Sequence, residues 1–145
     1  MSRLIENYLP PLKEDGLNTA KGILSSSTTA GIGYGTGAGG AVTQATNRTT
    51  GVTVNTISGA ITTNNTSLAA EAAAVFTVTN SAVAIGDVVV VSIQSGSNGG
   101  NTKVTVNTVA AGSFVIQVAN DNAAAGVAET GAIIINYAIF KAVSA

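Results

Sequence analysis

Four carboxylates beyond residue 70 are the side chains best suited to acid–base chemistry: Glu71, Asp87, Asp121 and Glu129. The chain contains no His and no Cys, which excludes imidazole and thiolate catalysis and metal sites built on these ligands. The carboxylates lie beside turn signals, where a side chain that caps a turn is the simpler interpretation. Serine and threonine hydroxyls are numerous, but no base is identifiable that could activate one of them. We therefore expect no catalytic residue and no enzyme activity.

The glycine-rich segment contains the spacing G-x-G-x-x-G at Gly35, Gly37 and Gly40. In a dinucleotide site this motif follows a strand, opens a helix and precedes an acidic residue that binds the ribose. Here the following residues are strand-like, and no acidic residue occurs between Asp15 and Glu71. We therefore expect no cofactor. We also expect no metal site, because acidic and amide residues do not alternate as in a calcium-binding loop.

The distribution of charge argues against nucleic-acid binding and marks a boundary in the chain. The net charge is -1, and the six basic residues are too dispersed to form a phosphate-binding stripe. Nearly half of all charges lie in residues 1–21, and a stretch rich in Gly, Ser and Thr follows. Such a stretch has high backbone freedom and little to bury. We predict an N-terminal arm and strap over residues 1–40 and a β domain over residues 41–145.

Short runs of alternating apolar and polar residues predict the strands of that domain. Phe76 and Val78 alternate with threonines, and the pattern recurs at Val104 and Val106 and again from residue 114 to 118. The alternation shifts phase near Asn55, which predicts a bulge or corner there. About seven strands at this spacing are typical of a sandwich. We predict an all-β fold, an antiparallel β-sandwich or jelly-roll-like body with an extended N-terminal arm.

Two runs are apolar at consecutive positions, residues 88–93 and 133–140. A strand that is apolar on both faces must be covered on both faces, and no helix is predicted that could provide the second cover. We therefore predict that another subunit covers them, with these interface residues: Val89, Val91, Ile93, Ile134 and Phe140. No window approaches the length of a membrane-spanning segment, so no membrane contact is expected.

The N-terminal arm carries apolar side chains that it cannot bury alone. We predict that five of them dock on a partner protein: Leu4, Ile5, Tyr8, Leu9 and Leu12. The Gly/Ser/Thr stretch behind them would let the arm follow the surface of that partner. A disordered tail is the alternative interpretation.

Three blocks of this sequence resemble a known family. They are GYGTGAGGAVTQATNRTTGVTVN from Gly33, FTVTNSAVAIGDVVVV from Phe76 and GAIIINYAIFKA from Gly131. This pattern is similar to a β-module of tailed-bacteriophage structural proteins, the capsid decoration (cement) and head-fibre family. The resemblance covers residues 33–142 and does not include the arm.

The resemblance implies a virion structural protein without catalytic residues or cofactor. It implies a homotrimeric β-sandwich on the outer surface of the capsid, where the major capsid protein is the expected partner. The short arm favours a capsid decoration protein, because a fibre would normally carry a long shaft or a second domain. The alternative is a fibre-tip or adhesin module that binds a host receptor or glycan. That alternative predicts aromatic residues on exposed loops, whereas the loops here are rich in Asn, Gly and Ala.

Overall fold

The structure of the chain is a computed structural model that describes residues 26–29 and 31–142. Contacts divide the chain into two units, residues 1–33 and 34–145, and the strands of the described residues all belong to the second unit. The described residues contain strands and turns but no helix, and thus no helix that could span a membrane. The predicted all-β fold is confirmed. In the first unit, the hydroxyl oxygens of Ser27 and Thr29 lie 3.4 Å apart.

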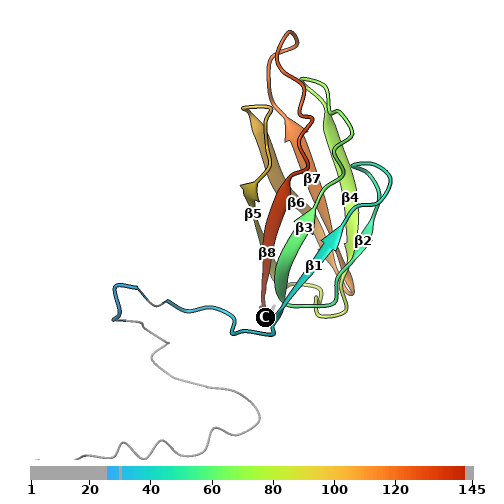
Figure 1. Cartoon of the computed structure of the whole chain (residues 1–145). Helices are drawn as coiled ribbons and strands as arrows, with labels where there is room; N and C mark the ends of the chain where they lie inside the picture. The colour runs from blue at the N-terminus through green and yellow to red at the C-terminus, as the bar shows by residue number, and fades with distance from the viewer. Residues whose placement is uncertain (1–25, 30, 143–145) are drawn as a thin grey trace, which may run out of the picture. The chain divides into compact units, whose positions relative to one another are not determined.

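Eight strands form two four-stranded sheets that pack face to face as a sandwich (Figure 1). Sheet 1 has the strand order β1 (Gly39–Thr43), β3 (Ser58–Thr62), β8 (Ile134–Phe140) and β5 (Val88–Ser95). Sheet 2 has the order β2 (Val52–Thr53), β4 (Ala73–Thr79), β7 (Ser113–Asn120) and β6 (Thr102–Ala110). The first strand therefore begins two residues before the domain boundary predicted at Ala41.

Both sheets are mixed, whereas the sequence analysis predicted antiparallel pairing. β1 pairs with β3 in parallel, and β2 pairs with β4 in parallel; the remaining pairs are antiparallel. A parallel pair needs a crossover connection between its strands. Here β2 serves as the crossover between β1 and β3, and β3 serves as the crossover between β2 and β4. The chain thus alternates between the sheets over its first four strands.

The predicted break near Asn55 is a corner at which the chain leaves sheet 2 and enters sheet 1. Thr53 ends β2 and Ser58 begins β3 on the opposite layer. The following strand approaches β1 very closely, because a Cβ atom on Gly59 would lie 2.2 Å from the carbonyl oxygen of Gly40. A residue with any side chain at position 59 would push β1 away from the sheet.

The core lies between the two sheets and follows the predicted alternation. Inward residues of β4 and β7 are buried, and their neighbours along each strand are more exposed. The rings of Phe114 in sheet 2 and Tyr137 in sheet 1 meet across the core with centroids 5.7 Å apart. Their packing joins the two layers.

The connections gather at two ends of the sandwich, seen as the lower and upper ends in Figure 1. The lower end comprises residues 54–57, 80–87 and 111–112, together with the residues that follow β8. The upper end comprises residues 44–51, 63–72, 96–101 and 121–133. The buried polar and charged side chains of the described residues lie in these connections or, for Asn120, at the end of β7 that borders the upper end.

Candidate interaction surface

The five predicted interface residues do not share one face. Val89, Val91 and Ile93 are half-buried and pack against the core, while Ile134 is half-buried and Phe140 is exposed. The outer face of β5 is instead formed by Val88 and Val90, which the sequence analysis left out of the interface set. The predicted docking residues of the arm, Leu4, Ile5, Tyr8, Leu9 and Leu12, lie outside the described residues.

The outward-facing side of β5 was predictable from the polar residue of the strand, Ser92. In the run of four valines, apolar side chains occupy both odd and even positions, so the valines alone do not reveal the outward face. Ser92 has the same parity as Val88 and Val90, and all three are exposed. Since side chains alternate along a strand, a polar residue at an even position marks the even positions as outward.

Four apolar residues on β5 and β8 form an outer apolar stripe on sheet 1. Val88 pairs with Phe140, and Val90 pairs with Ala138, so these side chains are direct cross-strand neighbours. Val88, Val90 and Phe140 are 53%, 50% and 54% exposed, respectively. The next pair toward the upper end is polar, Ser92 with Asn136. The outer apolar stripe therefore occupies the lower half of this face.

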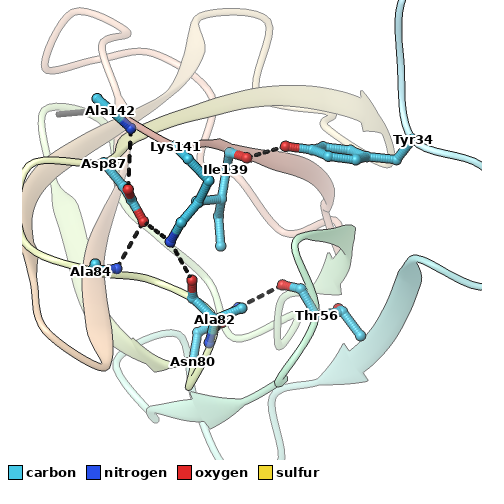
Figure 2. A network of polar contacts seen from close by, with 9 residues as sticks. All are labelled: Tyr34, Thr56, Asn80, Ala82, Ala84, Asp87, Ile139, Lys141 and Ala142. Carbon is cyan, nitrogen blue, oxygen red and sulfur yellow. Dashed lines mark hydrogen bonds and ion pairs between the residues drawn. The ribbon is translucent and has the colours of Figure 1, made fainter. Parts of the chain in front are cut away.

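Tyr34 extends the outer apolar stripe and ties the start of the domain to it. Its hydroxyl donates a hydrogen bond to the carbonyl oxygen of Ile139, as Figure 2 shows. Its ring lies 6.4 Å from the ring of Phe140 between centroids. The domain thus begins beside the end of its last strand.

Below the stripe, a buried carboxylate holds the two residues that follow β8 against the β4–β5 turn (Figure 2). Asp87 Oδ2 lies 2.5 Å from Lys141 Nζ and accepts a hydrogen bond from the backbone N–H of Ala84 at 2.8 Å. Asp87 Oδ1 accepts from the backbone N–H of Ala142 at 3.3 Å. The hydrogen bond from Lys141, together with those from the backbone, holds the pKa of Asp87 below its usual value. Asp87 therefore acts as the turn cap that its position after a glycine predicts.

The outer face of sheet 2 is mostly polar, and its exposed large apolar residue is Val75 on β4. On β6 and β7, Thr105 and Gln117 are opposite each other, and Asn107 Nδ2 donates to Gln117 Oε1 at 2.9 Å. Lys103 on the same strand forms an exposed ion pair with Asp121 at 2.5 Å. Hydroxyl, amide and charged groups of this kind remain solvated without a partner. Of the two outer faces, the lower half of sheet 1 is the better candidate for contact with another protein.

The upper end holds the second buried carboxylate, Glu129, for which the sequence favoured the cap of a turn. Its side chain is fully buried and accepts hydrogen bonds from five groups. Two are the hydroxyl groups of Ser97 and Thr102. The other three are the backbone N–H groups of Asn98, Gly99 and Gly131. Burial raises the pKa of Glu129, but these hydrogen bonds outweigh burial and lower the pKa to about 2. No sequence signal identified this role, because the donors come from two separate loops.

Arg48 is the buried cation of the same end. It donates to the carbonyl oxygens of Thr66 and Gly131 at 2.5 and 2.7 Å and to Thr63 Oγ1 at 3.2 Å. Burial lowers the pKa of Arg48, and the negative charge of Glu129 partly offsets this effect. Among the described residues, every buried side-chain nitrogen and oxygen has a hydrogen-bond partner. Arg48 and Glu129 are therefore occupied in holding loops, and neither is poised to accept a substrate.

Comparisons with protein-family models, curated proteins and solved structures found no match to this chain. In the part of the chain that the structure describes, no three acidic side chains come together as metal ligands would. The outer apolar stripe is therefore the candidate interaction surface of the described residues.

Proposed function

We propose that this chain is a virion structural protein that decorates the outer surface of a bacteriophage capsid. It assembles as a homotrimer through the outer apolar stripe and docks on the major capsid protein through its N-terminal arm. The proposal rests on the resemblance of residues 33–142 to capsid decoration proteins. The structural observation that carries it is the contrast between the two outer faces. On sheet 1, Val88, Val90 and Phe140 are half-exposed side by side, whereas on sheet 2 the exposed large apolar residue is Val75 alone and the rest of that face is mostly polar.

The position of Tyr34 supports separate roles for the β domain, which forms the trimer, and the arm, which binds the capsid. Because Tyr34 is held against the end of β8, the residues before it start from a defined point on the domain. In a trimer, three such arms share one rigid body. Once the first arm has docked, the other two face a high effective concentration of binding sites, so weak contacts at each arm suffice for stable attachment.

Deletion of residues 1–22 tests the arm assignment. The shortened protein keeps Tyr34 and all eight strands, so we expect it to sediment as the same oligomer as the full chain. We expect it to lose binding to purified capsids that lack the decoration protein. A second variant, with Leu4, Ile5 and Leu9 changed to serine, keeps the arm length and should lose binding as well.

Two outcomes would contradict the proposal. Capsid binding by the shortened protein would show that the arm is not the docking element. Binding of the isolated β domain to host cells or polysaccharide, without binding to capsids by any form, would favour the adhesin function instead.

A further inference from the structure

Asn98–Gly99, in the β5–β6 loop, is the only Asn-Gly pair in the chain. In such a pair, the backbone nitrogen of the glycine can attack the side-chain carbonyl carbon of the asparagine and close a five-membered succinimide ring. A residue with a Cβ atom would hinder this approach, and glycine does not. Asn98 therefore belongs to the kind of asparagine that forms this ring most readily, and it lies in this loop.

The packing of this loop favours glycine at position 99. A Cβ atom there would lie 2.9 Å from Thr102 Oγ1 and 3.2 Å from Glu129 Oε2. A side chain at residue 99 would force Thr102 Oγ1 or the Glu129 carboxylate to shift. The packing that buries Glu129 thus creates the labile pair.

In the folded loop, the side chain of Asn98 is held by three hydrogen bonds. Its Oδ1 atom accepts from the backbone N–H groups of Thr130 and Gly131 at 3.0 and 3.1 Å. Its Nδ2 atom donates to Thr130 Oγ1 at 2.9 Å. Reorienting the amide toward the attacking nitrogen would break contacts to the β7–β8 connection, which costs free energy.

The attacking nitrogen is restrained as well. The N–H group of Gly99 is buried and donates to Glu129 Oε2 at 3.0 Å. Because the nitrogen must lose its proton to attack, negative charge develops beside a carboxylate that is already negative, and Coulomb repulsion opposes this step. The buried N–H is also shielded from hydroxide in solution.

We propose that Asn98 is a latent deamidation site, which Glu129 keeps unreactive in the folded protein and which reacts when the β5–β6 loop opens. In the reaction, the Gly99 nitrogen loses its proton and bonds to Cγ of Asn98. The Cγ–Nδ2 bond breaks, and the nitrogen leaves as ammonia after taking up a proton from solvent. One water then opens the ring and leaves aspartate or isoaspartate at position 98.

The product cannot restore the original loop. A carboxylate at position 98 has no Nδ2–H group to donate to Thr130, and it adds a second negative charge near Glu129. Isoaspartate also lengthens the backbone by one carbon, which moves the N–H groups that Glu129 accepts from. Because the change at residue 98 is covalent, it persists after the loop has closed again. This consequence does not depend on the proposed capsid function.

The test compares deamidation of the intact protein in buffer and in denaturing urea at the same mildly alkaline pH. Mass spectrometry of the peptide that contains residue 98 follows the exchange of side-chain nitrogen for oxygen. We expect the unfolded chain to react about tenfold faster or more, because the folded loop must first open. Asn107, which is followed by threonine on β6, is the internal control in the same digest.

Variants then test the role of Glu129. Ser97→Ala and Thr102→Val each remove one of its hydrogen bonds, and both should raise the rate at Asn98 in the folded protein several-fold. Ser92→Ala, on β5 outside the loop, is the matched control and should leave the rate unchanged. Equal rates at Asn98 in folded and unfolded wild type would overturn the proposal. No reaction in urea, or no increase in either loop variant, would also overturn it.

Discussion

Arg48 donates a hydrogen bond to the backbone carbonyl oxygen of Glu129 at 3.3 Å, while the carboxylate of Glu129 accepts from other groups. The two buried opposite charges thus attract each other without forming a direct ion pair. Arg48 holds the β3–β4 and β7–β8 connections together, and Glu129 holds the β5–β6 loop. The upper end therefore depends on both charges, each through a different set of loops.

Glu129→Gln should destabilise the protein most strongly near neutral pH. The variant loses the charge that five donors solvate, and we expect the free energy of unfolding to fall by about 2–4 kcal/mol at pH 7. The folded-state pKa of about 2 lies below the ordinary value of 4.5. The stabilisation is thus complete above about pH 4.5 and is lost as pH falls toward about 2. Urea unfolding at several pH values should show the wild type approaching the variant in acid; a constant difference would contradict this account.

Arg48→Met should be among the most destabilising substitutions at the upper end. It leaves Glu129 buried without a compensating cation and removes the hydrogen-bond donor of several carbonyl oxygens. We therefore expect the free energy of unfolding to fall by about 3–5 kcal/mol. Arg48→Lys keeps the charge but cannot reach the same acceptors, so it should fall between the wild type and Arg48→Met. Lys103→Met, which removes an exposed ion pair, should change stability by less than about 1 kcal/mol. Urea midpoints measured in parallel decide the order.

Val90→Asp should dissociate the proposed trimer and leave the domain folded. Val90 is half-exposed on the outer apolar stripe, so a charge there is tolerated in the monomer but not under a covering subunit. Thr105→Asp is the matched control, because it places the same residue on the exposed face of the other long edge strand, β6. Sedimentation equilibrium should show a smaller mass for Val90→Asp alone. Unchanged mass in both variants would remove the stripe from the subunit interface.

Asp87→Asn should lower the thermal midpoint more than Lys141→Met. The Asp87 side chain is 2% exposed and accepts from two backbone N–H groups besides Lys141, whereas the Lys141 side chain is 59% exposed. Because the folded-state pKa of Asp87 is lowered, its contribution is present at neutral pH and fades in acid below its ordinary pKa. Differential scanning calorimetry at pH 7 and in acid measures both effects. The reverse order of the two variants would show that the ion pair outweighs the turn cap.

The strands of sheet 2 were predictable because each carries its burial pattern in its own residues. Phe76 and Val78 alternate with threonines, and one face of β4 is buried while the other is exposed. The phase shift at Asn55 likewise predicted the corner between the sheets. The pairing of the strands was not predictable in this way. A parallel pair such as β1 with β3 depends on where β2 crosses, and alternation within a strand says nothing about its neighbour.

The amino-acid sequence by itself determined the all-β class, the strand positions and the lack of His and Cys chemistry, because alternation and composition are local properties. Only the tertiary structure decided that Val88 of β5 lies beside Phe140 of β8, and that Glu129 is buried by a loop 30 residues away. These relationships join residues far apart in the chain, and they exist only once the sheets have packed and the loops have closed over the ends.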